Sequence, residues 1–112
     1  LDEAVQLISK ALEFEPENGY FIDSLGWAYY QQGKYPEALR ELKRAAERTK
    51  EDPVILDHLG DAYLKNGSPE DAIAAWEKSL RLDPSSESVK KKLQETREML
   101  SRQKGERTKA QQ

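Results

Sequence analysis

Asp57, His58 and Asp61 place two carboxylates and the single histidine of the chain within about one helical turn. Paired carboxylates can act as general acid and base or bind a cation, and histidine is a frequent metal ligand. A metal site needs further ligands, the chain has no cysteine, and no nucleophile–base pattern or phosphate-binding glycine loop accompanies these residues. We therefore predict a non-enzymatic protein without metal or cofactor. The two carboxylates are interpreted as a charged wall, and His58 as a solvated or groove-edge residue.

The charge of the chain is divided between an acidic body and a basic end. Residues 1–86 contain 17 acidic and 10 basic side chains, whereas residues 87–112 contain 4 acidic and 8 basic ones. The acidic body opposes binding to nucleic acid, and the lysine run at 90–92 is interpreted as a solvated helix face. No apolar run approaches the ~18 residues of a membrane span, so no membrane insertion by this segment is predicted. The chain begins with Leu1 rather than methionine, which predicts a fragment of a longer protein.

A sequence frame recurs every 34 residues. The stretches SLGWAYYQQGKY (24–35) and HLGDAYLKNGSP (58–69) share Leu-Gly, Ala-Tyr and a later glycine in the same order. A repeat of this length indicates stacked supersecondary units. Within the frame, however, Trp27 of one copy is replaced by Asp61 in the other. The positions that match at this spacing include Leu25/Leu59/Leu93, Gly26/Gly60, Tyr29/Tyr63, Gly33/Gly67 and Ala4/Ala38/Ala72.

Each repeat unit is predicted to consist of two α-helices. Asn18, Asp52 and Ser86 are good N-cap residues at the same spacing, and Gly33 and Gly67 can adopt the positive φ of a helix C-terminus. No stretch alternates with the period of a strand, so the predicted fold class is all-α. The predicted helices cover residues 1–14, 19–32, 36–49, 53–66, 69–82 and 87–103, and residues 104–112 are predicted to form a disordered basic tail.

Small residues stand where neighbouring helices should touch. Gly26 and Gly60 lie inside predicted helices, where glycine costs about 1 kcal/mol relative to alanine, so a packing need is indicated. Trp76 occupies a frame position and is predicted to lie in the core. The second repeat supplies the frame residues Ile22, Leu25, Gly26, Tyr29, Ala38, Leu42 and Ala45, and the third supplies Leu56, Leu59, Gly60, Tyr63, Ala72, Trp76, Ser79 and Pro84.

These residues resemble the signature of the tetratricopeptide repeat family. The resemblance covers residues 1–86 and implies antiparallel helix–turn–helix repeats stacked as a right-handed α-solenoid of about six helices. It also implies a scaffold or adaptor function. Similarity to the C-terminal repeats of large bacterial proteins leaves the compartment open: cytoplasm, or periplasm and outer membrane if the parent chain carries an export signal. The expected divisions are the second helix of a truncated repeat at 1–18, full repeats at 19–52 and 53–86, and a capping helix at 87–103, together forming a domain over 1–103.

The family resemblance implies a concave groove lined by the first helix of each repeat, where ligand segments bind. Positions that hold the stack must match between copies, whereas positions facing a ligand are free to differ, which would explain the exchange of Trp27 for Asp61. The predicted partner is a protein or peptide segment with apolar anchors and basic side chains. The predicted groove residues are Tyr20, Asp23, Trp27, Tyr30, Gln31, Asp57, Asp61, Leu64 and Lys65.

Three alternatives accompany this prediction. A pocket for a C-terminal carboxylate, known in the family, is rejected because Asp23, Asp57 and Asp61 would repel it. Trp27 and Tyr30 could instead pack against an upstream repeat. The rival function is self-association as a homodimer, because the first helix would lack its partner helix and leave an apolar face uncovered. The predicted self-association residues are Ala4, Leu7, Ile8 and Ala11.

Overall fold

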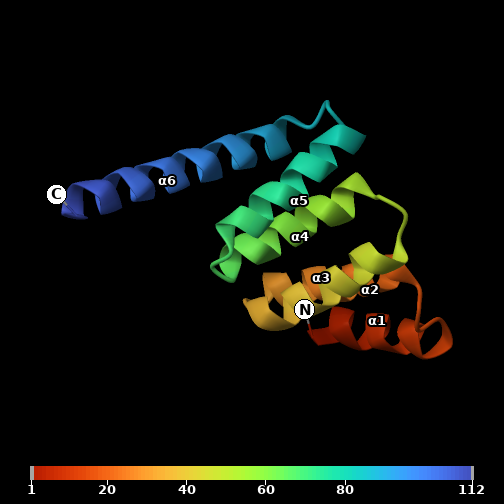
Figure 1. Ribbon diagram of the computed structural model, residues 1–112. Helices are drawn as coiled ribbons and strands as arrows, with labels where there is room; N and C mark the ends of the chain where they lie inside the picture. The colour runs from red at the N-terminus through yellow and green to blue at the C-terminus, as the bar shows by residue number, and fades with distance from the viewer. Residues whose placement is uncertain (1, 112) are drawn as a thin grey trace.

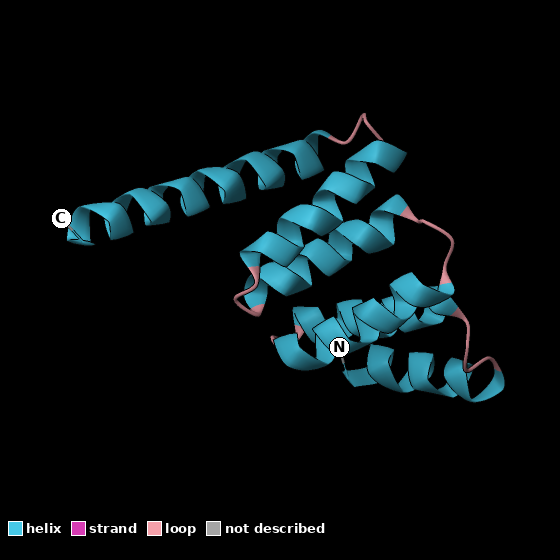
Figure 2. Ribbon diagram, viewed as in Figure 1, coloured by secondary structure: helices cyan, strands magenta, loops and turns pink. Residues whose placement is uncertain are grey.

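The computed structural model describes residues 2–111, with side chains described for residues 3–107. This part of the chain contains six α-helices and no strand (Figures 1 and 2). Five of the helices end within two residues of the predicted ends. The elements are α1 (Asp2–Phe14), α2 (Gly19–Gln31), α3 (Tyr35–Arg48), α4 (Pro53–Lys65), α5 (Pro69–Leu82) and α6 (Glu87–Gln111).

The helices form antiparallel hairpins that stack as a right-handed α-solenoid, which confirms the predicted fold class. Helices α2 and α3 make one hairpin, α4 and α5 the next, and α1 packs on α2 (Figure 1). The molecule is elongated, with extents of 58 × 28 × 20 Å. Within the described helices, none is both long and apolar enough to cross a membrane.

Side-chain caps fix where the first helix of each repeat begins. The carboxamide oxygen of Asn18 accepts hydrogen bonds from the backbone N–H groups of residues 20 and 21, at 3.0 and 3.2 Å. The carboxylate of Asp52 does the same for residues 54 and 55, at 2.8 and 3.2 Å. Each of these helices is followed by a glycine with positive φ, 78° at Gly33 and 79° at Gly67, which turns the chain into the second helix.

The core is built around the predicted frame positions. Trp76, Leu42 and Ile22 are fully buried. A Cβ atom on Gly26 would lie 2.7 Å from Leu42 Cγ, and one on Gly60 would lie 2.7 Å from two carbons of the Trp76 ring. The two glycines therefore allow a large side chain of the following helix to reach the helix backbone.

Helix α6 is longer than predicted. It continues from Glu87 to Gln111, whereas the capping helix was expected to end at 103 and residues 104–112 were expected to be disordered. Glutamate, lysine, arginine and alanine of this segment favour helix, and Gly105 costs only about 1 kcal/mol without breaking it. Figure 1 shows the C-terminal half of α6 running beyond the ends of α4 and α5. Leu1 and Gln112 lie outside the described residues.

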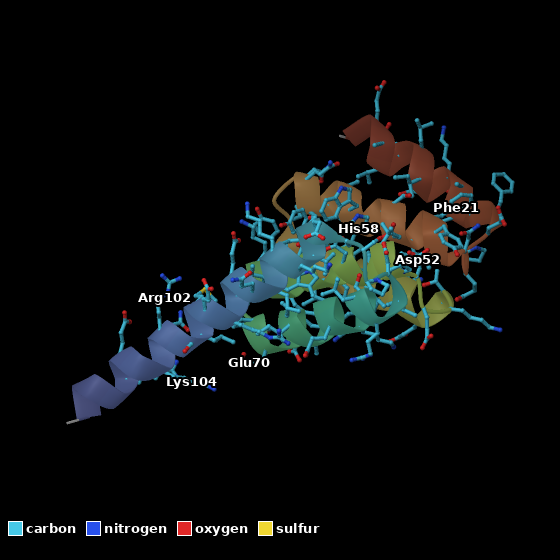
Figure 3. The ribbon with its side chains drawn as sticks, turned by 90° about the horizontal axis from the view of Figure 1, so that it is seen from above. Phe21, Asp52, His58, Glu70, Arg102 and Lys104 are labelled. Atoms are coloured by element: carbon cyan, nitrogen blue, oxygen red, sulfur yellow. The ribbon has the colours of Figure 1, made fainter. Side chains whose placement is uncertain are left out.

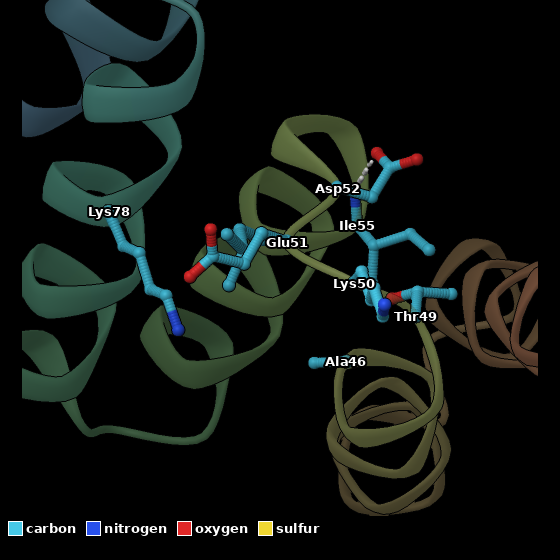
Figure 4. A pocket seen from close by; sticks show the side chains of 8 residues that line it. Ala46, Thr49, Lys50, Glu51, Asp52, Ile55 and Lys78 are labelled. Atoms are coloured by element: carbon cyan, nitrogen blue, oxygen red, sulfur yellow. Dashed lines mark hydrogen bonds between the residues drawn. The ribbon is translucent and has the colours of Figure 1, made fainter.

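A hollow of about 290 Å³ lies where the two repeats join (Figure 4). Its floor contains Ile55, and its rim contains Lys50, Glu51 and Lys78. The Asp52 carboxylate at its edge is engaged in capping α4. The hollow is thus lined by side chains of mixed charge around the connection between repeats.

Candidate functional site

His58 of α4 reaches back to two residues of α2. Its Nδ1 atom lies 2.9 Å from Asp23 Oδ1, and its ring stacks on the Trp27 ring with centroids 4.1 Å apart and an interplanar angle of 17°. The side chains of His58 and Asp23 are 20% and 16% exposed. His58, labelled in Figure 3, is therefore part of a contact between repeats rather than a solvated residue.

Lys92 of α6 reaches back to α4 in the same way. Its ammonium nitrogen lies 2.6 Å from Asp57 Oδ1 and 3.0 Å from Asp61 Oδ1, and 5.8 Å from the centroid of the Trp76 ring. The lysine side chain is 28% exposed. The lysine run at 90–92 is thus not uniformly solvated, because its last member is an inward-facing ion-pair partner.

The two contacts occupy the same register. His58 and Lys92 stand one repeat length apart, and so do the residues that they contact, Asp23 with Asp57 and Trp27 with Asp61. At the first boundary Trp27 of α2 provides an aromatic ring, and the imidazole of His58 on α4 stacks on it. At the second boundary Asp61 of α4 provides a second carboxylate, and the ammonium of Lys92 on α6 pairs with it. The exchange of Trp27 for Asp61 is therefore matched by the exchange of His58 for Lys92 on the helix that packs against it.

A row of rings continues from His58 along α2. Trp27 stacks on Tyr30 with centroids 4.6 Å apart and an interplanar angle of 7°, and Tyr30 meets Tyr35 edge-on at 5.3 Å. The rings of His58 and Tyr30 both lie nearly parallel to the indole of Trp27. Two rings with centroids 4.1 and 4.6 Å from the indole do not fit side by side on one of its faces. Trp27 is therefore held between His58 and Tyr30. The ammonium of Lys65 lies 5.5 Å from the centroid of Tyr35, at the end of the row. We call this surface the α2–α4–α6 face and define it by Asp23, Trp27, Tyr30, Asp57, His58, Asp61 and Lys92.

Some predicted groove residues lie apart from these contacts. Tyr20 is 59% exposed at the start of α2, and Gln31 is exposed at its end. Leu64 is half-buried and packs against the core cluster that contains Trp76. Three residues that make these contacts were missed as site residues: Tyr35, His58 and Lys92. The separation of His58 and Lys92 by one full repeat is the sequence signal that could have paired the last two.

The ionisation of the carboxylate–lysine cluster follows from burial and proximity. Burial alone would lower the pKa of Lys92, but its hydrogen bonds to Asp57 and Asp61 together with the charges of these carboxylates outweigh burial and raise the pKa. Burial raises the pKa of Asp61, and the charge of Asp57 adds to this shift, so that the pKa stays raised although Lys92 lowers it. The raised pKa of Lys92 favours a charged pair, whereas the raised pKa of Asp61 favours a neutral carboxyl group. The short nitrogen–oxygen distances support the charged pair at neutral pH. Burial also raises the pKa of Tyr30, and the Asp61 charge adds to this shift.

The predicted self-association face is partly covered. Ala4, Ile8 and Ala11 are half-buried, whereas Leu7 is 68% exposed. Phe14, two turns further along α1 and on the same side as Leu7, is 85% exposed. An apolar stripe therefore remains on α1, but it is centred on Leu7 and Phe14.

Antiparallel helical hairpins whose contacts recur in the same register from one hairpin to the next define a helix–turn–helix repeat protein. The chain belongs to the tetratricopeptide repeat family, because the family's sequence model matches residues 24–87. Tetratricopeptide repeats form protein-interaction modules. Comparison with curated protein sequences finds no match.

Solved structures of other tetratricopeptide repeat proteins share the fold. The first such domain of Spaghetti (RPAP3), bound to the HSP90 peptide SRMEEVD, has a TM-score of 0.85 at 21% identity, over 89% of this chain and 81% of that one. The first domain of human RPAP3 has a TM-score of 0.85 at 20% identity, over 93% and 82%. A crystal structure of MamA has a TM-score of 0.83 at 22% identity, over 89% of this chain and 58% of that one.

Proposed function

We propose that the α2–α4–α6 face binds an extended segment of a partner protein. The observation that carries this proposal is the stack of His58, Trp27 and Tyr30, which joins two repeats and leaves the half-buried rings at the surface. Because both sides of the indole are occupied, a partner would contact ring edges rather than stack on Trp27. Rings held in this way lose little conformational freedom on binding, which favours their use as anchors.

The charges of the face favour a partner with basic side chains. Asp23, Asp57 and Asp61 contribute three carboxylates, whereas Lys92 contributes one ammonium. The remaining negative charge lies beside the aromatic row. A lysine or arginine of the partner would share these carboxylates with Lys92. Charge would therefore determine which partners bind more than it would increase the binding affinity.

We infer that an acidic C-terminal segment is not the natural ligand of this face. The Spaghetti domain binds the peptide SRMEEVD. At 21% identity the likeness concerns the fold alone, and the α2–α4–α6 face of this chain presents three carboxylates. Carboxylates of such a peptide would meet like charge at Asp23 and Asp57.

Replacing Trp27 by alanine is expected to weaken binding of a basic apolar peptide about tenfold or more. The probe is a fluorescently labelled peptide that alternates leucine and arginine over about eight residues, an extended chain of roughly 25 Å, measured by fluorescence anisotropy. The peptide SRMEEVD serves as the acidic comparison and is expected to bind more weakly. Trp27→Phe, which keeps an aromatic ring against His58, is expected to retain most of the affinity. Equal affinity of the wild type and Trp27→Ala for the basic peptide would contradict the proposal.

Self-association is the second candidate function, and the exposed pair Leu7 and Phe14 favours it. If α1 forms a dimer interface, Leu7→Lys should abolish a dimer that light scattering detects in the wild type. Ser9→Lys adds the same charge on a different side of α1 and should leave the dimer intact. A wild-type protein that stays monomeric as its concentration is raised would exclude this function.

A further inference from the structure

A second cleft, of about 670 Å³, lies beneath the part of α6 that leaves the body. One wall is the end of α4 and the start of α5, with Leu64, Lys65 and Glu70, and the other is α6 from Met99 to Arg107. Figure 3 shows Glu70 and Lys104 on one side of α6, and Arg102 on the opposite side. Two predicted groove residues, Leu64 and Lys65, thus line this cleft.

The inward stripe of α6 changes character along the helix. Its first part is apolar and buried: Val89 is 2% exposed and Leu93 is 6% exposed. Leu100, two turns further on, is half-buried at the cleft. Two more turns along the same stripe stands Arg107, which is exposed. The helix therefore packs on the body with its first half and presents a cationic side with its second.

The lining of the cleft combines apolar side chains with an excess of positive charge. Leu64 and Leu100 are half-buried within it. The described residues that line it include three basic side chains and one carboxylate. Those charged residues are Lys65, Lys104, Arg107 and Glu70. An occupant that complements this lining carries carboxylates and one or two apolar side chains.

We propose that this cleft binds an acidic, apolar-anchored segment of a partner protein. The site is distinct from the α2–α4–α6 face and has the opposite charge preference. Apolar side chains of the segment lie on Leu64 and Leu100, and its carboxylates meet the basic side chains of α6. The two surfaces together would let the domain hold a basic segment and an acidic segment at once.

The proposal is tested on the full chain with a labelled amphipathic peptide of glutamate and leucine, about four helical turns long. Fluorescence anisotropy is expected to show saturable binding, and Arg107→Glu is expected to weaken it about tenfold. Arg102→Glu makes the same charge change on the other side of α6 and is expected to alter the affinity less than about twofold. Trp27→Ala is expected to leave this binding unchanged, whereas it weakens binding of the basic peptide. Circular dichroism of each variant verifies that α6 stays helical.

Three results would overturn the proposal. The first is absence of saturable binding to the wild type. The second is equal weakening by Arg102→Glu and Arg107→Glu, which would indicate general attraction to a basic helix. The third is a mixed-sequence single-stranded oligonucleotide that competes with the acidic peptide and binds more tightly, which would assign the cleft to nucleic acid.

Discussion

Trp76→Ala is expected to lower the free energy of unfolding by about 3–5 kcal/mol, measured by urea denaturation. The Trp76 side chain is fully buried between α4 and α6, where it packs with Val89 and Leu93. Its Nε1–H donates a hydrogen bond to Asp57 Oδ1 at 3.1 Å, so the substitution removes both packing and a bond between helices. Trp76→Phe keeps most of the volume and should cost clearly less. A loss below about 1 kcal/mol for Trp76→Ala would contradict the described core.

Gly60 lies against the ring of Trp76, so substitutions at the two positions should not be independent. Gly60→Ala should destabilise the wild type by about 1–3 kcal/mol, because the added carbon collides with the buried ring. In the Trp76→Ala background the same change should become neutral or stabilising, because alanine favours helix. Gly105→Ala, where no atom of the described residues lies within 4 Å of the added carbon, should stabilise in both backgrounds. Additive effects of Gly60→Ala and Trp76→Ala would exclude this contact.

Asp61→Lys is expected to lower the free energy of unfolding by about 2 kcal/mol, because it sets two ammonium groups together in a partly buried site. The Asp61 side chain is 14% exposed, so solvent screens the repulsion incompletely. Urea denaturation measures the loss. Glu95→Lys makes the same charge change at the equivalent, exposed position of α6 and should stay within about 0.5 kcal/mol of the wild type.

The double variant Asp61→Lys/Lys92→Asp provides the decisive comparison. It keeps two carboxylates and one ammonium in the cluster and should recover at least half of the stability lost in Asp61→Lys. A loss of stability in Asp61→Lys is not expected from the sequence alone, which predicted that Asp61 faces a ligand. If the double variant is as unstable as the sum of the two single variants, the ion pair between α4 and α6 does not stabilise the fold.

The helices and their order could be predicted because their signals are local. The caps at Asn18 and Asp52 and the glycines at Gly33 and Gly67 define ends that tertiary packing leaves in place. The period of the repeat then determines which helices pair. Trp76 was correctly predicted to lie in the core, because a frame position that packs in one repeat packs in the next.

The contacts across the repeat boundary were not predicted, because the one-repeat spacing of His58 and Lys92 relates these two residues to each other but does not name what they contact. Lys92 was predicted to be solvated as part of a lysine run, but it stands three residues after Val89 and four before Thr96, both buried, and its ammonium contacts Asp57 and Asp61. His58 gains its role from a ring and a carboxylate that belong to the preceding repeat. Its pairing depends on the stacking of whole hairpins, which a helical wheel of one helix does not represent.

The end of α6 shows a different limit. The absence of large apolar residues after 103 predicted disorder, but a helix whose first half is anchored by Val89 and Leu93 can continue into solvent at little cost. The cleft beneath it forms because α6 is longer than α5 and extends beyond it. That difference in length depends on the sequences of both helices.

The most direct test of the proposed binding face uses Trp27 as its own reporter. The chain has two tryptophans, so Trp76→Phe leaves Trp27 as the sole source of indole emission. Titration with the basic leucine–arginine peptide is expected to shift this emission saturably, with the same dissociation constant that anisotropy gives. An emission spectrum that stays constant while anisotropy shows the peptide bound would place the partner elsewhere on the molecule.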